Sequence, residues 1–403
     1  MWLLVSLLIL ALPGLATPWV QTTSLPDAYV GQSLAYASGY LYQAGGSSDS
    51  VGYPDGTNVF YAQVHTNGTI GAWTNATSLP EAVFTHAGVA ANGFVYVLGG
   101  QHYNSTNGVS TSSSVYYAKI NSDASLGSWQ TANPLPDVRF SLSASVWNNR
   151  IYAIGGANDN YLSNTVYSAI IQTNGSLSAW TTQTPLPVAI FTQASVANGF
   201  LYVLGGTVNN GNTITNTVYY SKINADGTLA GWNQTASLPQ PESLFGAVAA
   251  NGWVFTIGGF NGSEPTGSFY GAAVKGDGSL VSWSSGTSLP QSEDYEAVAA
   301  SGSYIFFTGG ANSQESSSAV YSMALPASPT TPAFVSSGFT NGNFRLQLTS
   351  STNTGFGLLA STDLMTWTNI GSGFTDTNGM LLFQDTNAAS FSNRFYRAYW
   401  PLP

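Results

Sequence analysis

The apolar residues of this chain occur in short runs that end in a Gly-Gly doublet, and this combination appears six times. The first glycines of the doublets are Gly45, Gly99, Gly155, Gly205, Gly258 and Gly309. A Leu-Pro pair precedes each doublet by 19 or 20 residues, and a tryptophan lies six residues before each of those leucines. A period near 50 residues with several short strands in each unit predicts a β-propeller, with one four-stranded sheet, or blade, per repeat.

Each repeat contains four strand-like segments, which we name strands a to d. Small residues after Leu-Pro, such as those from Ala87, predict strand a as the innermost strand, where large side chains would not fit. An Asn-Gly type of turn leads to the apolar strand b, which ends at Gly-Gly. Strand c follows, and a second turn leads to strand d, which carries the tryptophan 14 residues after strand c begins.

The sixth repeat lacks a strand d of its own. Counting 14 residues from Val320 reaches Phe334, which lies beyond a proline-rich stretch. The missing tryptophan segment is found at the other end of the chain, from Trp19 to Thr22. Pairing of this segment with the last blade would remove open sheet edges, which favour aggregation. We therefore predict a six-bladed, all-β propeller that the N-terminal strand closes.

The repeat resembles the kelch repeat over about residues 18–325. The resemblance rests on the Gly-Gly after an apolar strand, the aromatic residue on the next strand, the tryptophan and the Leu-Pro pair. Two features depart from the kelch pattern: an extra turn precedes the tryptophan, and only Arg139 supplies the arginine often found after Leu-Pro. The resemblance implies a propeller fold and much less about activity, since one fold hosts many functions.

The ends of the chain predict two further segments. Residues 1–16 are interpreted as a signal peptide, because the apolar run from Trp2 to Leu12 is too short to span a bilayer and small residues follow it up to Ala16. The alternative is a buried first strand. We assign residues 17–326 to the propeller, 327–332 to a linker and 333–403 to a small antiparallel, β-sandwich-like module.

The C-terminal module is similar to modules of secreted proteins from verrucomicrobial and planctomycete-type bacteria. The resemblance rests on the stretch from Ala360 to Thr368, the segment from Phe383 to Asp385 and the closing residues from Arg394 to Arg397. It implies a secreted or bacterial cell-surface location, and surface attachment, export sorting and glycan binding all stay open as roles for the module.

The composition excludes some partners and some chemistry. Charged residues make up only 6% of the chain, and 8 basic residues stand against 18 acidic ones. This balance argues against nucleic acid or an anionic membrane as partner, since either needs clustered Lys and Arg. With no cysteine, disulfides and thiolate chemistry are excluded. We expect a monomer with no cofactor and no transmembrane segment in the mature chain.

Candidate catalytic and metal-binding residues are few. His86, His102 and Glu81 form a minimal metal set as a weak alternative to no metal site. The enzymatic alternative is a carbohydrate-active isomerase, similar to an epimerase or mutarotase, or a lyase, with Glu296 as base and Arg139 as its electrostatic partner. The resemblance to kelch-type propellers also brings in a copper radical oxidase, whose site is built on a cysteine-linked tyrosine. This function is excluded because the chain has no cysteine.

The loops from d to a and from b to c should gather around one mouth of the central channel, where propellers usually bind ligands. We predict ligand-binding residues on these loops at Tyr53, Tyr103, Tyr161, Tyr295, Arg139 and Glu296. Phenylalanines recur five residues after the leucine of Leu-Pro, at Phe84, Phe140 and Phe191. For these three, core packing and ligand binding both stay open.

Three functions remain. The leading hypothesis is an exported, non-catalytic propeller that binds a glycan or an extracellular protein at the channel mouth, since aromatic and acidic loop residues suit such ligands. The carbohydrate-active enzyme is the second hypothesis. A structural surface protein is the third.

Overall fold

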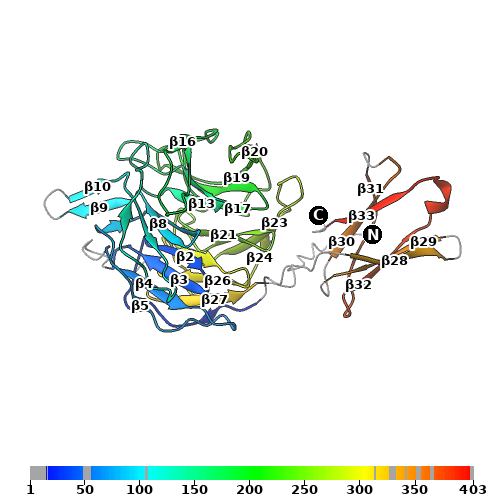
Figure 1. Cartoon of the computed structure of the whole chain (residues 1–403), viewed down its shortest axis with the longest axis horizontal. Coiled ribbons are helices and arrows are strands. Elements are labelled where there is room, and N and C mark those ends of the chain that lie inside the picture. Colours follow the sequence, from blue (N-terminus) through cyan, green and yellow to red (C-terminus); the bar gives the residue numbers. More distant parts are fainter. Residues whose placement is uncertain are drawn as a thin grey trace, which may run out of the picture. The chain divides into compact units, whose positions relative to one another are not determined.

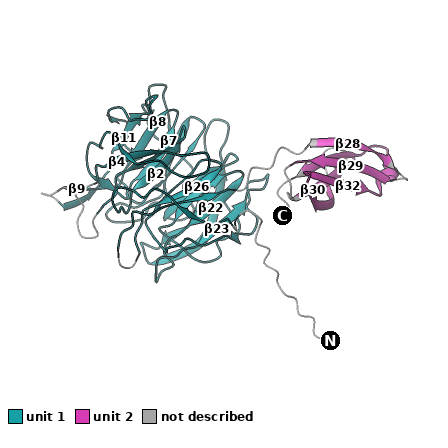
Figure 2. Ribbon diagram, turned by 90° about the horizontal axis from the view of Figure 1, so that it is seen from below, with its two compact units in different colours: residues 1–326 teal, residues 327–403 magenta. Residues whose placement is uncertain are grey.

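The computed structural model describes residues 15, 17–48, 56–104, 108–312, 315–325, 333–340, 343–350, 355–363 and 367–399. Tyr53, the predicted linker 327–332 and all of the predicted signal peptide except Leu15 lie outside these residues. The chain divides into two compact units, residues 1–326 and 327–403, which are coloured separately in Figure 2.

In its described part, the first unit contains six four-stranded antiparallel sheets, the blades (Figure 1). Blade 1 consists of β2 Ser33–Ala37, β3 Tyr40–Ala44, β4 Val59–Gln63 and β5 Thr74–Asn75. Blade 2 consists of β7 Ala87–Ala91, β8 Phe94–Leu98, β11 Val115–Lys119 and β12 Gln130–Thr131. Blade 3 consists of β13 Ser143–Trp147, β14 Arg150–Ile154, β15 Val166–Ile170 and β16 Thr181–Thr182.

The remaining blades follow the same order. Blade 4 consists of β17 Phe191–Ala197, β18 Phe200–Val208, β19 Thr213–Lys222 and β20 Asn233–Gln234. Blade 5 consists of β21 Gly246–Ala250, β22 Trp253–Ile257, β23 Phe269–Ala273 and β24 Ser284–Ser285. Blade 6 consists of β25 Ala297–Ala300, β26 Tyr304–Thr308, β27 Val320–Ala324 and the N-terminal β1 Val20–Gln21. The first strands of neighbouring blades contact one another in ring order, so strand a is innermost.

The N-terminal strand closes the ring, as the tryptophan spacing predicts. Val20 pairs with Ser322, and Gln21 pairs with Tyr321. The indole of Trp19 donates a hydrogen bond to the Thr287 carbonyl on the preceding blade. The tryptophans of the other five blades make the same contact, at 2.8–3.0 Å: Trp73 to Thr23, Trp129 to Thr77, Trp180 to Asn133, Trp232 to Thr184 and Trp283 to Ala236.

The Gly-Gly doublets join each blade to the next. The second glycine donates its N–H to a carbonyl of the following blade at 2.7–2.9 Å: Gly46 to Val83, Gly100 to Arg139, Gly156 to Ile190, Gly206 to Glu242, Gly259 to Glu293 and Gly310 to Tyr29. The first glycine has a positive φ, and a Cβ there would fall 2.5–3.0 Å from the same carbonyl. Close approach and left-handed backbone together therefore require glycine.

Turns between strands a and b and between strands c and d lie on one face of the ring, which we call the turn face. In the c–d turns a side-chain oxygen accepts the N–H two residues on, at 2.9–3.1 Å, from Asn67, Asp123, Asn174, Asp226 and Asp277. Four tyrosine hydroxyls of strand b donate to the next blade's c–d turn, at 2.7–2.9 Å: Tyr42 to Ala124, Tyr96 to Gly175, Tyr152 to Gly227 and Tyr202 to Gly278. The turn face therefore repeats both in sequence and in contacts.

Leu15 is buried in blade 5. In blades 1, 2 and 4 a tyrosine of strand c stacks on a tyrosine of strand b, with ring centroids 6.0–6.2 Å apart. Blade 5 has Gly271 at this position, and the Leu15 side chain lies beside Gly271 and Phe255. The Leu15 carbonyl also accepts the Thr287 N–H at 2.9 Å. Cleavage after Ala16, the predicted site, would remove these contacts.

Blades 2 and 4 depart from the common pattern on the opposite face. Blade 2 adds a three-stranded sheet of β6 Val83–Phe84, β9 Gln101–Asn104 and β10 Gly108–Thr111, whose hairpin extends away from the ring in Figure 1. In blade 4 the first three strands are longer than elsewhere and pair through a register shift between Leu204 and Gly206.

The second unit contains two three-stranded antiparallel sheets. One has the order β28 Ala333–Thr340, β29 Asn343–Thr349 and β32 Met380–Asp385. The other has the order β31 Thr368–Phe374, β30 Gly355–Ser361 and β33 Phe395–Tyr399, and a short 3-10 helix spans Ala388–Ser390. Leu346, Leu348, Phe356, Leu358 and Phe383 from both sheets form one core. None of the described residues forms a helix with the length and hydrophobicity that a membrane crossing requires.

Candidate functional site

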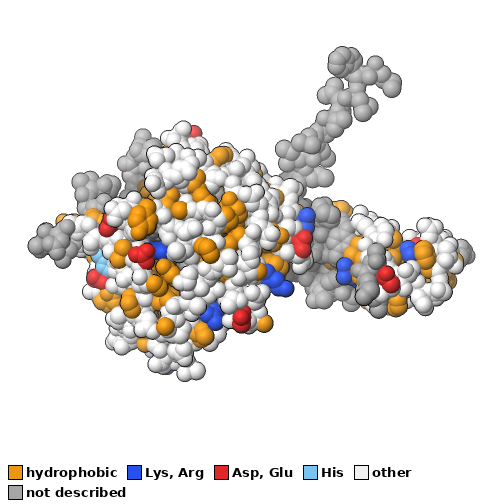
Figure 3. All heavy atoms as spheres, turned by 90° about the horizontal axis from the view of Figure 1, so that it is seen from above, with side chains coloured by type: hydrophobic (Ala, Val, Ile, Leu, Met, Phe, Trp, Pro, Cys, Tyr) orange, Lys and Arg blue, Asp and Glu red, His pale blue; other side chains and the backbone are white. Residues whose placement is uncertain are grey.

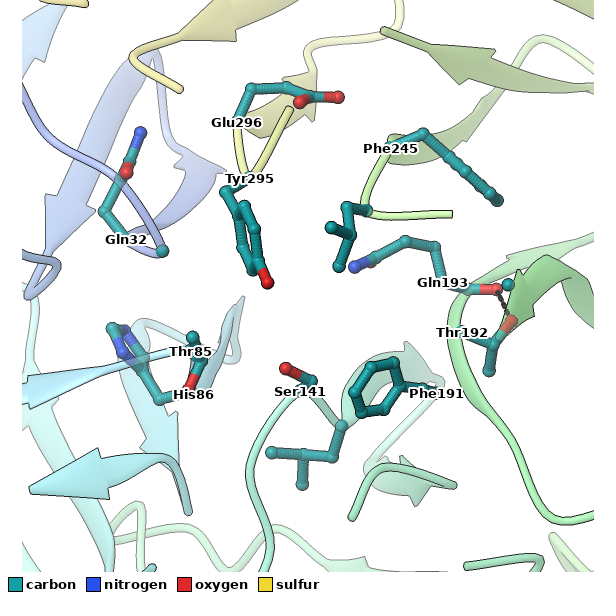
Figure 4. A pocket seen from close by; sticks show the side chains of 14 residues that line it. Gln32, Thr85, His86, Ser141, Phe191, Thr192, Gln193, Phe245, Tyr295 and Glu296 are labelled. Carbon is teal, nitrogen blue, oxygen red and sulfur yellow. Dashed lines mark hydrogen bonds between the residues drawn. The ribbon is translucent and has the colours of Figure 1, made fainter. Parts of the chain in front are cut away.

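The d–a and b–c connections share the face opposite the turn face, which we call the loop face. A small cavity of about 70 Å³ opens there on the axis, which we call the axial cavity (Figure 4). Two positions of every repeat line it, six and seven residues after the leucine of Leu-Pro. Position six holds Gly31, Thr85, Ser141, Thr192, Leu244 and Tyr295, and position seven holds Gln32, His86, Leu142, Gln193, Phe245 and Glu296.

Position six forms a nearly complete ring of backbone hydrogen bonds. Five of its six residues have φ between 46° and 64°, and four of these five are not glycine. The bonds run from Thr85 to Gly31, Ser141 to Thr85, Gly31 to Tyr295 and Tyr295 to Leu244, at 2.8–3.1 Å. Thr192 lies instead in the longer strand β17, and its hydroxyl donates to the Leu204 carbonyl. Left-handed backbone at such residues is strained, so the neighbouring blades must hold it in place.

Position seven is nine-tenths buried where its residue is Gln32, His86 or Glu296. Each of these side chains has one polar group bonded. Gln32 Nε2 donates to the Thr308 carbonyl at 2.9 Å, His86 Nε2 lies 2.9 Å from Ser33 Oγ, and Glu296 Oε1 accepts the Gly246 N–H at 2.6 Å. The second polar atom of each, Gln32 Oε1, His86 Nδ1 and Glu296 Oε2, has no hydrogen-bond partner. Buried polar atoms are normally paired, so three such atoms around one cavity are unusual.

Burial shifts the pKa of both titratable groups of this ring in the direction that favours the uncharged form. Loss of hydration lowers the pKa of His86 to about 3, and His102 nearby adds to the shift. Loss of hydration raises the pKa of Glu296 well above its usual value, and the charges of Asp294 and Glu293 act in the same direction. No lysine or arginine is among the described residues that line the axial cavity.

Beside Glu296, blades 5 and 6 bury two further carboxyl groups. Glu242 and Glu293 are 0% and 1% exposed, at a position that is Val83 in blade 2 and Ile190 in blade 4. Desolvation raises the pKa of Glu293 to about 7, against a lowering effect of the nearby Ser317 hydroxyl, and neither of its oxygens has a partner that meets hydrogen-bond geometry. Desolvation also raises the pKa of Glu242. A groove of about 420 Å³ lies alongside, lined by Glu264, Pro265, Thr266, Gly267, Ser292 and Asn312.

Of the predicted tyrosines that the structure describes, Tyr295 alone lines the axial cavity. Figure 4 shows its hydroxyl toward the middle of the cavity, together with the Ser141 hydroxyl and the Gln193 amide. Tyr103 is 38% exposed on the β9 hairpin of blade 2, and Tyr161 is 57% exposed in the b–c loop of blade 3. Tyr53 lies outside the described residues. The predicted tyrosines therefore do not form one cluster, although the described ones are exposed on the loop face.

Arg139 is part of the wall between blades 2 and 3. It is 2% exposed, and its guanidinium donates to the Gly155 carbonyl and the Thr165 hydroxyl and lies over the Tyr167 ring. Glu296 belongs to blade 6, which is opposite blade 3 in the ring. The structure therefore does not bring Glu296 and Arg139 together as the enzymatic alternative requires. Phe140 and Phe191 contact each other edge to face at 6.0 Å, and Phe191 also lines the cavity.

The residues of the metal alternative are distributed over two separate networks. His102 Nδ1 lies 2.7 Å from Glu81 Oε2, and the Tyr116 hydroxyl donates to the other oxygen of Glu81. His86 is bonded to Ser33 in the axial ring. Among the described residues no group of three or more His, Cys, Asp or Glu side chains is placed to hold a metal ion.

Charge is distributed unequally between the two faces of the propeller. In the described residues the loop face carries Asp27, Glu81, Asp137, Asp159, Glu242, Glu264, Glu293, Asp294, Glu296 and Glu315, with the buried Arg139 as its single basic residue. The other basic residues of the propeller, Lys119, Arg150, Lys222 and Lys275, stand at the turn face. Charged side chains are sparse on the side of the molecule that Figure 3 shows. The loop face therefore has a negative balance without a free cation of its own.

Sequence reasoning missed Gln32, Ser141 and Gln193, and it considered His86 only as a metal ligand. A signal for them was present. Position seven occupies a fixed place in a regular repeat, yet it changes from Gln to His, Leu, Phe and Glu around the ring. When the residue type changes at a position whose backbone surroundings stay the same, the fold alone does not require that residue.

Comparison with known proteins places this propeller near kelch proteins. Kelch-like protein 23 of Mus musculus is 25% identical over 281 residues, which are 68% of this chain and 45% of that protein. Kelch-like protein 41b of Danio rerio is 24% identical over 206 residues, 48% of this chain and 30% of its own length. Beta-scruin of Limulus polyphemus is 23% identical over 247 residues, 58% of this chain and 25% of its own length. The chain thus spans less than half the length of these relatives.

One solved structure, titled "Structure of YjhT", superposes with a TM-score of 0.60 and 14% identity, covering 82% of this chain and 99% of that one. At this identity the likeness shows the fold alone. No protein-family profile matches the chain. The low-identity relatives and this structure together support a kelch-repeat β-propeller.

Proposed function

We propose that this protein is an exported, non-catalytic propeller that binds another protein on its loop face. The observation that carries the proposal is the contrast between an axial cavity of about 70 Å³ and the exposed side chains around it. Pockets that enclose small molecules usually measure roughly 300–1,000 Å³. A cavity this small holds one side-chain head group of a larger partner, while Tyr103, Tyr161 and Tyr295 provide contact surface outside it.

The relatives support this reading, because kelch-like propellers suggest a protein-binding scaffold. The geometry also disfavours catalysis by the residues first considered. Burial raises the pKa of Glu296, which disfavours the carboxylate that a general base needs, and Arg139 is bonded in the opposite part of the ring. The C-terminal unit is proposed to localise the exported chain at the cell surface.

A glycan is the second candidate, and the exposed tyrosines favour it. Tyr161 and Tyr103 are amphipathic rings on exposed loops, the kind of platform on which a sugar ring packs. A glycan would have to lie across the loop face, because the axial cavity does not enclose a sugar ring.

Site-specific photocrosslinking tests the proposal. A photoreactive residue is placed at Tyr161 on the loop face and, in a matched protein, at Ser279 on the turn face. Crosslinked species from the native cell envelope are identified, and the recombinant partner is then titrated directly. The proposal expects crosslinks from position 161 alone and an affinity that Tyr161→Ala and Tyr295→Ala each lower about tenfold. Crosslinks from position 279 alone, or direct binding to a glycan panel with no protein partner, would reject it.

A further inference from the structure

We propose that the partner inserts a primary amine into the axial cavity, from either a lysine side chain or a chain N-terminus. This inference rests on the proposed role of the loop face. It adds the chemistry by which that face recognises its partner.

The first support is a set of unsatisfied acceptors. Gln32 Oε1, His86 Nδ1 and Glu296 Oε2 line the same cavity and have no hydrogen-bond partner. The Ser33 hydroxyl can donate to the Ala44 carbonyl, 3.5 Å away, and accept from His86 Nε2, which leaves Nδ1 with a lone pair. An ammonium group has three donors and no acceptor, so it matches a wall whose free atoms are acceptors.

The second support is charge. Glu296 is 8% exposed and has no cation near it, and the carboxyl groups of Asp294 and Glu293 increase the negative potential around it. The single basic residue of the loop face, Arg139, is already bonded to Gly155 and Thr165. Among the described residues, the propeller's remaining Lys and Arg side chains stand at the turn face, so a cation for this site would come from outside the propeller unit.

The third support is size and shape. A volume of about 70 Å³ accommodates an ammonium group with the end of its methylene stem. Tyr295 and Phe191, which line the cavity, offer aromatic surface for that stem and for the charge itself. A guanidinium is larger and needs a planar arrangement of acceptors, so the cavity favours an amine over arginine.

Short peptides provide the test. The probes are tetralysine with an acetylated N-terminus, a peptide with a free N-terminus and acetylated lysine side chains, a fully acetylated peptide and tetraglutamate. Calorimetric titration of the full mature chain at pH 7 and low salt is expected to show binding of the first or second probe, which identifies the source of the amine. The last two probes are expected not to bind.

Variants then locate the site. Glu296→Gln keeps an oxygen for the Gly246 N–H and should lower the affinity for the amine probe at least about tenfold. Gln32→Leu, which copies Leu142 at the same position of blade 3, should weaken binding in the same direction. Asp277→Asn removes one negative charge from the turn face and places there the residue of blades 1 and 3, so it should change the affinity less than about twofold.

Proton release gives an independent readout. An ammonium group beside Glu296 favours its carboxylate form, so titration in two buffers of different ionisation enthalpy should show more proton release by the wild type than by Glu296→Gln. Equal binding of acetylated and free peptides, or unchanged affinity in both cavity variants, would overturn the inference. If the amine probes fail while crosslinks still come from position 161, the inference falls and the proposed function stands. If an amine probe binds while crosslinks come from position 279 alone, the proposed function falls and the amine site stands.

Discussion

The two faces of the propeller are built on the same repeating backbone, which we call the frame. They differ in whether their side chains repeat with that backbone. On the turn face, Asn or Asp oxygens bond their own turns, and tyrosine hydroxyls bond the next blade in four successive interfaces. On the loop face, the backbone bonds of the Gly-Gly doublets repeat in all six blades. The side chains around these backbone bonds do not repeat. Buried polar atoms without a hydrogen-bond partner occur here in Gln32, His86, Glu242, Glu293 and Glu296.

This difference separates structure from function. Where sequence and contacts repeat together, the fold explains the residue. At position seven the backbone repeats while the side chain changes, so the fold tolerates several residue types there. The residue present in each blade must then be explained by something other than the fold. Unpaired buried polar atoms cost stability, so their concentration on the loop face supports the partner-binding role proposed for this face.

The largest expected effect comes from removing the N-terminal strand that closes the ring. Deletion of residues 17–24 removes strand β1 together with Trp19, which is 8% exposed and bonded to Thr287. The loss should lower the free energy of unfolding by at least about 3 to 5 kcal/mol, the range for truncation of a large buried aromatic, and it exposes the edge of β27. Chemical denaturation and light scattering measure both effects. A monomeric product with unchanged stability would show that β1 does not close the ring.

A turn-face glycine gives the next largest effect. Gly175 has a φ of 87°, and a Cβ there would lie 2.4 Å from the Phe94 ring of the preceding blade. Gly175→Ala should cost about 2 to 4 kcal/mol, because left-handed strain adds to overpacking. Gly93 is the matched control: its φ is 82°, and nothing lies within 4 Å of its Cβ position.

Gly93→Ala should therefore cost only about 1 kcal/mol. Equal losses in the two variants would show that interblade contact at the turn face adds nothing to backbone strain. Denaturant titration of both proteins under the same conditions decides between these outcomes.

Loss of the Leu15 contact is expected to lower the free energy of unfolding by about 2 kcal/mol. A chain that begins at Leu15 should be more stable than one that begins at Thr17, because Leu15 is 2% exposed beside Gly271. Thermal unfolding of the two chains measures the difference, and N-terminal sequencing of the protein from its native source shows which form is natural. Equal melting temperatures would show that the contact is dispensable and that cleavage after Ala16 has no cost to the fold.

Much of the frame is predictable from sequence, and the site is predictable only in part. Gly-Gly and tryptophan specify the blades, because the doublet needs left-handed backbone with no Cβ and the indole N–H donates to a carbonyl of the preceding blade. Left-handed backbone at Thr85, Ser141 and Leu244 is not readable, since no glycine marks it and neighbouring blades impose it. Burial of Arg139 and Glu293 is equally hidden, because it depends on contacts between blades that are about 50 residues apart. Tyr295 can be placed at the channel mouth from sequence because its residue type and its loop position are both irregular among the repeats, and its role in ligand binding stays a prediction.

The buried acids predict a smaller, pH-dependent effect. The folded pKa of Glu293 is about 7, above its ordinary 4.5, so the folded state holds the extra proton and stability falls as pH rises from about 4.5 through 7. Glu293→Gln should remove this part of the slope and gain on the order of 1 to 3 kcal/mol at pH 8 relative to pH 5.

His86 acts in the opposite direction, because its folded pKa of about 3 makes stability fall as pH drops below about 6.5. The comparison is therefore made as the difference between wild type and variant at each pH, with Asp226→Asn on the turn face as control. A pH-independent difference for Glu293→Gln would mean that this carboxyl titrates normally in the folded protein.

The most direct test of the division between the two faces combines binding and stability in one experiment. Tyr103, Tyr161 and Tyr295 are replaced by alanine singly and together, and each protein is titrated with the crosslinked partner and melted. The account predicts affinity losses of about 1 to 3 kcal/mol per tyrosine with nearly unchanged melting temperatures, while Trp180→Ala lowers stability by about 3 to 5 kcal/mol. Unchanged affinity in every tyrosine variant, or stability losses that match Trp180→Ala, would contradict it.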